Sequence, residues 1–534
     1  MSDPDKVVRR VGAPTAGAPG WLVPAALAVM LFGLAKAPAI DEEAYLWIGR
    51  HLDLLRPYDW TRVWAPYDLD SYSWAHPPLH LYWMRLCTAL TDAPAALRVL
   101  AGAPWVALFA WSVARFAGRV CHHPGIAAAT WLASPIVVLG LQDTWMIDLP
   151  AVALLTFAMA AYREGLVDEE PAWFIGSGLA LGAAVETKYT MVVVVPVLAL
   201  HMRRLGPRWQ LWAAMLGVVL AVELPLWASY GRFHPLEMFT RRGEIAAGTV
   251  GPRALATLVR AALLGLPLAL LRADARLFAA GMGLSLVTLL VARPSEMPVT
   301  TSTFLVVLGA LGGTLLVRAT VAALSPAHRR RKGDRGDPLL LGGWFLAVVL
   351  GVVLLHNYAS ARYLLPAAAP GALLLARAAE EVSWGKLLAR VSVGVSAVVA
   401  LALSEADRRF VNAGAEVAAA AVSAVRDAGL PPGRFAGEWS FRGTMEDAGW
   451  TRHRPGEVLE PGVAFVAVDN ASPGEIPTDD LEPLRRVESP DRFPLRVIDL
   501  ERGVGLYAET LGPLPFGVGR GPLEGATIYE VQKR

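Results

Sequence analysis

The stretch that decides the fold lies at residues 21–45 and reads WLVPAALAVMLFGLAKAPAIDEEAY. Its first half is strongly apolar and predicts a helix that enters a lipid bilayer. Its second half carries Asp41, Glu42, Glu43 and Tyr45. Carboxylates at the mouth of a membrane helix are poor anchors, but a positioned carboxylate can accept a proton from a reacting group. The stretch therefore predicts a membrane protein with a chemical site at the end of its first span.

The composition of the whole chain agrees with this class. Of its 534 residues, 54% are hydrophobic and 18% are charged, whereas soluble domains are about 25% charged. The net charge of +2 gives no electrostatic reason for nucleic-acid binding. The sequence also has no phosphate-binding glycine loop and no zinc-finger spacing. A mainly α, polytopic membrane protein is expected.

Apolar segments of about 17–25 residues can cross a bilayer as helices. We expect about 13 such transmembrane helices, some of them short. They lie near 21–39, 94–117, 124–141, 148–162, 172–186, 189–206, 209–228, 254–271, 275–292, 301–320, 338–356, 363–379 and 386–404.

The distribution of Lys and Arg sets the expected orientation, because cytoplasmic loops are enriched in both. With the N-terminus inside, the largest basic cluster, RRRKGDR at 329–335, falls on the inner side. This arrangement predicts a multi-pass protein of the plasma (inner) membrane. The basic start, the apolar run and Ala37-Pro38-Ala39 also resemble a signal peptide with its cleavage site, but the apolar run is long for one.

The chain is expected to have three parts. Residues 1–20 form a cytoplasmic tail, and residues 21–404 form a transmembrane catalytic domain whose first outer loop, 40–93, carries the active site. Residues 405–534 form a soluble domain on the periplasmic or extracellular side, since an odd number of spans places them there.

The composition of the tail changes near Ser404, where charged residues, Gly and Pro become frequent. Alanines at helical spacing over 405–428 predict an amphipathic helix. About 130 residues suffice for one small α/β domain. Its expected strands are short β-rich pieces at 462–468, 495–498, 505–508 and 527–531.

The first outer loop is rich in aromatic and acidic residues. Asp59, Asp68 and Asp70 alternate there with aromatic side chains, namely Trp60, Trp64, Tyr67, Tyr72 and Trp74. Aromatic rings of this kind stack on sugars, and they also favour the membrane interface. The loop thus predicts either a sugar-binding surface or an ordinary interfacial belt.

A set of short motifs resembles one family. In order along the chain they are Asp41-Glu42-x-x-Tyr45, His76-Pro77-Pro78-Leu79, Ile147-Asp148-Leu149-Pro150, Gly178-x-x-x-Gly182-x-x-x-Glu186-Thr187-Lys188-Tyr189 and Arg362-Tyr363-Leu364-Leu365-Pro366. The ordered set covers about residues 20–404 and resembles the GT-C membrane glycosyltransferases. Within them it is most similar to protein O-mannosyltransferases and the lipid A aminoarabinose transferase.

The resemblance implies a polyprenyl-phosphate-linked sugar as donor, an outward-facing site and an inverting transfer to an acceptor hydroxyl. An acceptor alcohol needs a base in line with the anomeric carbon, and Asp41 is the candidate. Glu42 and Tyr45, from the same motif, are expected to contact substrate.

The leaving phosphate gains negative charge as the glycosidic bond breaks, so a fixed cation should lie beside it. Arg362 is the expected phosphate ligand, although snorkelling to the interface would also explain its place, and Tyr363 next to it is expected to contact substrate. Lys188 either binds phosphate or pairs with Glu186.

Two motif positions admit several roles. His76 stands where some relatives carry a phosphate-holding Lys, and His is only partly charged near neutrality, so a hydrogen bond to donor or acceptor is equally expected. Asp148 is a candidate site carboxylate, but a carboxylate at a helix N-terminus is also favoured by the helix dipole. Gln142 and Asp143 are alternatives to it.

No cofactor is expected, and a divalent cation held by the acidic loop is not favoured. Cys121-His122-His123 is an unpromising metal motif because three adjacent residues rarely bind one ion. Expected partners are the polyprenyl-phosphate-sugar donor, the bilayer and a protein, lipid or glycan acceptor, and no nucleic acid. The competing class is a transporter or flippase for a lipid-linked sugar, and a membrane scaffold is a third.

The orientation can be tested by reporter fusions. A fusion at Gly333 should report the cytoplasmic side and one at Gly433 the outer side, because inner loops hold most of the basic charge. Alkaline phosphatase and a fluorescent protein, fused at each position in turn, measure the two sides. Matching signals at the two positions would mean that a span has been miscounted.

Overall fold

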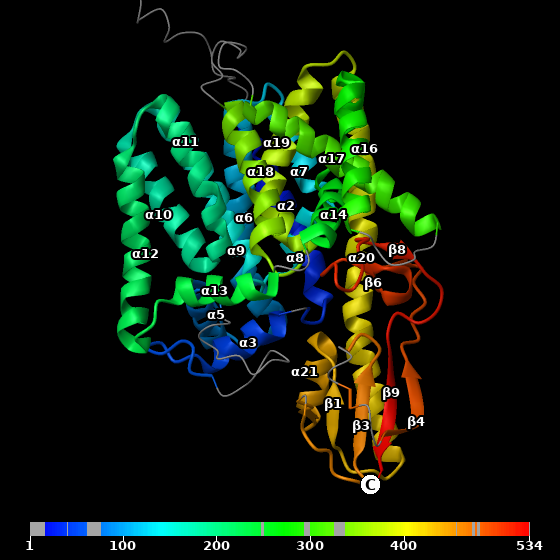
Figure 1. Ribbon diagram of the computed structural model, residues 1–534. Coiled ribbons are helices and arrows are strands. Elements are labelled where there is room, and N and C mark those ends of the chain that lie inside the picture. Colours follow the sequence, from blue (N-terminus) through cyan, green and yellow to red (C-terminus); the bar gives the residue numbers. More distant parts are fainter. Residues whose placement is uncertain are drawn as a thin grey trace, which may run out of the picture.

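The protein is mainly helical, with a small sheet at one end (Figure 1). The computed structural model describes residues 17–39, 41–60, 76–246, 250–292, 299–324, 337–454, 456–471, 476–477 and 481–532. Helices packed side by side form a bundle, and the C-terminal strands lie below it in the view of Figure 1. The basic cluster at 329–335 and most of the aromatic loop, including Trp64, Tyr67, Asp68, Asp70, Tyr72 and Trp74, lie outside the described residues.

Six helices among the described residues are long and apolar enough to cross a membrane. They are α6 (Pro94–Val120), α12 (Trp209–Tyr230), α16 (Ala275–Ala292), α17 (Val299–Leu324), α18 (Asp337–Leu355) and α20 (Gly385–Asp427). The pair α7 (Pro124–Leu132) and α8 (Pro135–Gln142) is bent by 63° and adds a seventh if it is one span. The polytopic, mainly helical fold is confirmed, and the number of about 13 spans is not.

The other expected spans are helical but are not among these six: most are short or broken, whereas the helix that begins at Asp148 is continuous over 21 residues. They correspond to α2 (Leu22–Phe32), α9 (Asp148–Asp168), α10 (Pro171–Thr187), α11 (Val195–Leu205), α14 (Val250–Ala261), α15 (Leu268–Ala273) and α19 (Ala368–Glu380). Among the described residues, four of the expected segments contain a 3₁₀ turn, at η1 (Gly33–Ala35), η2 (Tyr189–Val194), η3 (Ala262–Leu264) and η5 (Ala361–Ala367). The sequence predicted continuous helices there because the hydropathy of a segment is the same whether its backbone forms an α-helix or a 3₁₀ turn.

Small residues let two helices of the bundle approach closely. Gly178 and Gly182 lie one turn apart on α10, so they share a face. A Cβ atom at Gly178 would lie 2.2 Å from the carbonyl oxygen of Leu211 on α12. One at Gly182 would lie 2.8 Å from the carbonyl oxygen of Met215. Glycine at both positions is therefore required for the backbone contact between α10 and α12.

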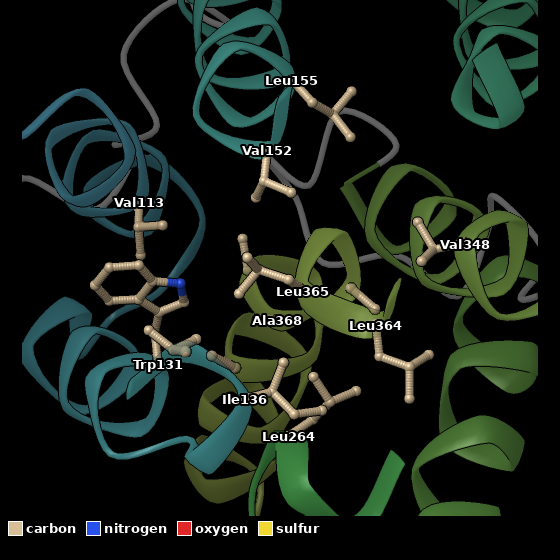
Figure 2. Packing of buried hydrophobic residues seen from close by; sticks show 14 of the residues in the cluster. Val113, Trp131, Ile136, Val152, Leu155, Leu264, Val348, Leu364, Leu365 and Ala368 are labelled. Carbon is tan, nitrogen blue, oxygen red and sulfur yellow. The ribbon is translucent and has the colours of Figure 1, made fainter. Parts of the chain in front are cut away.

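The core of the bundle anchors the turn that begins at Ala361. Leu364 and Leu365 of η5 are fully buried and belong to the largest apolar cluster. Figure 2 shows both side chains among those of α8, α18 and the η3 segment, with Ile136, Val348 and Leu264 labelled around them. A Cβ atom on Gly140 of α8 would lie 2.8 Å from Leu365 Cδ2. This packing fixes the backbone next to Arg362.

In its described residues, the first predicted loop, 40–93, contains two helices, α3 (Glu42–His51) and α5 (Leu79–Leu90). They pack on each other through Gly49, where a Cβ atom would lie 3.1 Å from the Met84 backbone. Together with α13 (His234–Ala246) they lie across one end of the bundle, the same end as the C-terminal sheet (Figure 1). Cys87 of α5 and Cys121 after α6 are buried free thiols.

The expected domain boundary at 404–405 falls inside α20, which runs unbroken from Gly385 to Asp427. The amphipathic helix expected over 405–428 is thus the continuation of an apolar one. A single helix, the long yellow one in Figure 1, links the bundle to the sheet.

The C-terminal domain is an α/β unit, as predicted. Its main sheet has the order β2-β1-β3-β9-β4, with β1 parallel to β2 and β3, and β9 antiparallel to β3 and β4. The strands are β1 (Arg434–Ala436), β2 (Thr451–Arg452), β3 (Ala464–Val468), β4 (Leu481–Glu488) and β9 (Gly525–Val531), and α21 (Trp439–Asp447) lies between the first two in sequence. Two pairs of very short strands, β5 (Leu495–Arg496) with β8 (Gly517–Val518) and β6 (Ile498–Asp499) with β7 (Val504–Gly505), complete it. The edge strand β4 was missed because it is charged and mostly exposed.

Candidate active site

The centre of the candidate site is a contact between Asp41 and Arg362, which are 321 residues apart in sequence. Asp41 Oδ2 accepts a hydrogen bond from Arg362 Nη2 at 3.0 Å. Asp41 occupies the N-cap position of α3, but its side chain makes no capping hydrogen bond. The ordinary explanation for an Asp at this position therefore does not apply, and the carboxylate is directed to the arginine instead.

The two partners differ in exposure. The side chain of Asp41 is 40% exposed, whereas that of Arg362 is 13% exposed. Among the described residues, Arg362 is the only hydrogen-bonding partner of the Asp41 carboxylate. One oxygen of Asp41 thus binds the arginine, while the side chain as a whole stays 40% exposed.

Arg362 is held by aromatic side chains as well as by the carboxylate. Its Nη2 group also lies 3.1 Å from the Tyr358 hydroxyl and 3.4 Å from the Tyr363 hydroxyl. Its guanidinium carbon lies 5.2 Å from the centre of the Tyr363 ring. Cation–π contacts of this kind stabilise a cation that is partly removed from water. Tyr358 was not predicted from the sequence, because no motif position marks it.

A second ion pair lies next to Tyr363. Lys188 Nζ is 2.5 Å from Asp148 Oδ1 and 4.5 Å from the centre of the Tyr363 ring. Lys188 separates α10 from η2 and has an extended backbone conformation. The sequence predicted that Lys188 either binds phosphate or pairs with Glu186. In the structure its ion pair is with Asp148. Phosphate binding by Lys188 stays a prediction. Arg362, Tyr363, Lys188 and Asp148 therefore form one cluster with Asp41.

One carboxylate oxygen of Asp148 is available to a ligand. It is buried and opens α9, so the helix dipole favours its charge. Its Oδ2 atom has no hydrogen-bond partner among the described residues. A buried acceptor without a partner is costly, and a ligand hydroxyl placed there would remove that cost.

Tyr45 lies close to both carboxylates. Burial raises the pKa of Tyr45 well above its usual value, and the negative charges of Asp41 and Asp148 raise it further. The ring packs edge-on against His80, with 4.9 Å between the ring centres. Tyr45 therefore stays protonated and can only act as a neutral hydrogen-bonding group.

His80, four residues after His76, was not predicted to belong to the site. Burial lowers the pKa of His80 to about 4, so the imidazole is neutral at pH 7. Its Nε2 atom lies 2.9 Å from the Trp145 carbonyl oxygen and donates a hydrogen bond to it. The sequence signal was its place four residues after His76 in the motif HPPLH, where His76 precedes α5 and His80 lies in its first turn.

His76 itself lies at the edge of the described residues. Its carbonyl oxygen accepts a hydrogen bond from the Tyr58 hydroxyl at 3.0 Å, and its side chain is half-buried. Neither observation tests whether its imidazole contacts substrate. That role stays a prediction.

Glu42 requires a correction. Its side chain is 0% exposed, and both carboxylate oxygens accept hydrogen bonds from Arg98 at 3.2 Å. They also accept the backbone N–H groups of Ala39 at 3.0 Å and Trp145 at 3.2 Å. A carboxylate that is fully occupied inside the protein has no group left for substrate. Glu42 instead positions the start of α3, and therefore Asp41.

A buried charge cluster next to the site was also missed. Lys36 lies 2.5 Å from Asp407 of α20 and also pairs with Asp143, the residue predicted as an alternative to Asp148. The Tyr507 hydroxyl donates to Asp407. Burial raises the pKa of Asp143 to about 6, and the charge of Lys36 opposes this rise. The cluster connects the segment before Asp41 with the C-terminal domain.

The C-terminal domain also supports the turn that carries Arg362. The Ala361 N–H donates to the Leu506 carbonyl oxygen at 3.1 Å, and the Glu509 N–H donates to the Ala359 carbonyl oxygen at 3.1 Å. The Glu509 carboxylate in turn accepts the Ala359 N–H. Backbone on both sides of Ser360 is thus paired with residues near the end of the chain.

Arg260 of α14 fixes this C-terminal segment. Its guanidinium is fully buried and donates to the carbonyl oxygens of Gly505, Gly512 (3.1 Å) and Pro513 (3.3 Å). Three carbonyl groups from one segment therefore depend on one side chain.

The substitution Arg260→Met should destabilise the protein by about 2–4 kcal/mol, because it leaves buried carbonyl groups without donors. Chemical denaturation in detergent micelles measures this change. Arg318→Met is the matched control, since Arg318 forms a more exposed pair with Glu381 at 2.9 Å, and such pairs contribute about 0–1 kcal/mol. Equal effects of the two substitutions would contradict the supporting role of Arg260.

No three His, Cys, Asp or Glu side chains in the described part of the chain come together as a metal-binding group. The expectation that the protein works without a metal stays a prediction.

Comparison with protein families gives one match. Residues 75–228 match the family model described as dolichyl-phosphate-mannose-protein mannosyltransferase. The match covers less than a third of the chain, and it includes His76, Asp148 and Lys188 but not Asp41 or Arg362. The resemblance predicted from the motifs is confirmed over these residues.

Comparison with solved structures finds ArnT from Cupriavidus metallidurans, in a crystal structure bound to undecaprenyl phosphate and in one of the apo state. The first is 16% identical, with a TM-score of 0.42 over 85% of this chain and 93% of that one. The second is 16% identical, with a TM-score of 0.40 over 84% and 92%. No curated protein matches the chain.

Proposed function

We propose that this protein is an inverting glycosyltransferase that moves a sugar from a polyprenyl-phosphate donor to an acceptor hydroxyl at the membrane surface. The observation that carries the proposal is the contact between the Asp41 carboxylate and the Arg362 guanidinium beside the Lys188–Asp148 pair. A base and two cations within one cluster are what transfer from a sugar phosphate to an alcohol requires. The family match over 75–228 supports the same class.

Asp41 is the base in the proposed reaction. The acceptor oxygen forms a bond to the anomeric carbon, and the Asp41 carboxylate takes the proton of the acceptor hydroxyl. The bond between the anomeric carbon and the phosphate oxygen breaks on the opposite face, which inverts the configuration. The 40% exposure of Asp41 leaves room for an acceptor to approach it.

Arg362 and Lys188 bind the leaving group. Its phosphate gains charge as the glycosidic bond breaks, and charge-assisted hydrogen bonds to two cations stabilise that charge. Both cations are mostly buried, which strengthens their electrostatic effect. In this proposal the phosphate takes the place near Arg362 that the hydroxyls of Tyr358 and Tyr363 now share.

The remaining residues orient the sugar. Asp148 offers its unpartnered Oδ2 to a sugar hydroxyl, and Tyr45 offers a neutral phenol. His76 would contact donor or acceptor from the start of α5. We place the site on the outer face of the plasma membrane in a GT-C fold, without a metal or other cofactor. The acceptor is a protein, lipid or glycan, and the sugar is a hexose or a pentose.

The base assignment predicts that Asp41→Asn folds normally but loses transfer by about 10²–10⁴-fold, the usual contribution of a general base. Transfer of label from polyprenyl-phosphate mannose, and from the corresponding pentose donor, to membrane acceptors measures the loss. Asp92→Asn is the matched control, because Asp92 lies in the same loop, 86% exposed, and forms a long contact of 3.8 Å with Arg50. Near-normal transfer by a well-folded Asp41→Asn would remove Asp41 from this role.

The phosphate assignment predicts that Arg362→Ala raises KM for the donor more than KM for the acceptor. Arg362→Lys should recover only part of the loss, because an ammonium group cannot reproduce the planar fork. Initial rates at varied donor and acceptor concentrations measure both constants, with Arg50→Ala as the control on an exposed arginine of α3. Equal changes for the two substrates would indicate a structural role for Arg362.

The same preparations distinguish an enzyme from a transporter or flippase. Proteoliposomes that move a labelled lipid-linked sugar across the bilayer, but never join it to an acceptor, would favour the transporter. The enzyme predicts joined product and no movement that depends on Asp41.

A further inference from the structure

A groove lies at the end of the bundle opposite to the candidate site. It has a volume of about 590 Å³ and is formed where α7 and α20 begin. In Figure 1, α7 and α19 are at the upper end of the bundle, whereas α3 and α5 are at the lower end. The groove therefore has no part in the chemistry proposed around Asp41.

One end of the groove is basic. His122 and His123 line it before α7, and Lys386 and Arg390 line it from the first turns of α20. Lys386 and Arg390 are four residues apart, so they lie on one face of the helix. Both are exposed, and neither forms an ion pair with another described residue.

The carboxylates near the groove already have partners. Glu380, at the end of α19, accepts the backbone N–H of His123 at 2.8 Å. Glu381 binds Arg318 at 2.9 Å. Among the described residues, neither carboxylate forms an ion pair with Lys386 or Arg390, and the positive ends of the dipoles of α7 and α20 point to the same place.

The rest of the groove is apolar. Ile126 and Ala129 of α7 form one wall, and Ala389 and Val393 of α20 form the other. The face of α20 that lines the groove thus begins with a cation, Lys386, and ends with an apolar side chain, Val393. Because α20 is long and apolar enough to cross a membrane, this wall runs into the depth of the bilayer.

We propose that this groove binds an anionic phospholipid, with the headgroup phosphate between Lys386 and Arg390 and an acyl chain between α7 and α20. A cationic mouth above an apolar wall matches the two parts of such a lipid, and a water-soluble anion would use only the first. A zwitterionic lipid has the same chains but carries a positive group that these cations repel.

The test uses the purified full chain in micelles with equal amounts of phosphatidylglycerol and phosphatidylcholine. Native mass spectrometry measures the ratio in which the two lipids are retained. The wild type should retain phosphatidylglycerol preferentially, and Lys386→Gln with Arg390→Gln should lower the ratio by about tenfold, since two basic groups near the phosphate are lost.

Arg203→Gln with Arg204→Gln is the matched control. Both arginines are exposed in the last turn of α11, outside the groove, and the change in charge is the same. This control should change the ratio by less than about twofold. Equal loss in both double variants would overturn the proposal, because it would indicate general surface attraction.

A second variant tests the apolar wall. Val393→Trp fills the groove without altering its charge and should also reduce retention of phosphatidylglycerol. Soluble glycerol phosphate should not displace the lipid from the wild type. Retention unchanged in Val393→Trp, or displacement by glycerol phosphate, would show that no acyl chain occupies the groove and would overturn the proposal.

Discussion

The structure depends on one constraint, which is that charges buried within a helical bundle need partners. Asp41 binds Arg362, Asp148 binds Lys188 and Asp407 binds Lys36. For the two pairs with both members buried, Asp148–Lys188 and Asp407–Lys36, removing one member typically costs about 3–5 kcal/mol because the other is left uncompensated, whereas Asp41 is 40% exposed. Two of the pairs join elements distant in sequence, whereas Asp148 and Lys188 join the start of α9 to the end of the next helix, α10. The charged residues of the candidate site therefore also connect the elements that carry them.

The C-terminal domain shares in this arrangement. The Tyr507–Asp407–Lys36 chain connects it to the segment before Asp41, and its backbone pairs with residues on both sides of Ser360. Because α20 is continuous, no flexible linker separates the sheet from the bundle. A change in the C-terminal domain should therefore reach both Asp41 and Arg362, although neither belongs to it.

Much of the candidate site was accessible from motifs. Asp41, Asp148, Lys188, Arg362 and Tyr363 were all proposed from the sequence, and the fold brings them into one cluster. Lys36 and Tyr358 were not proposed, because an isolated residue outside a motif carries no signal, and His80 was not proposed although it directly follows the motif His76-Pro77-Pro78-Leu79. Glu42 shows the opposite case. It belongs to the same motif as Asp41, yet it faces Arg98 inside the protein because adjacent residues on a helix point in different directions.

The sequence by itself determined the class of protein, the approximate positions of its helices and the residue types available for chemistry. These features depend on hydropathy and spacing within short segments, so local information suffices. Only the tertiary structure decided which spans are broken, which carboxylate pairs with which cation, and that one helix joins the two domains. Those outcomes depend on contacts between residues as far apart as Asp41 and Arg362. Such contacts arise from the packing of whole helices, which no single segment specifies.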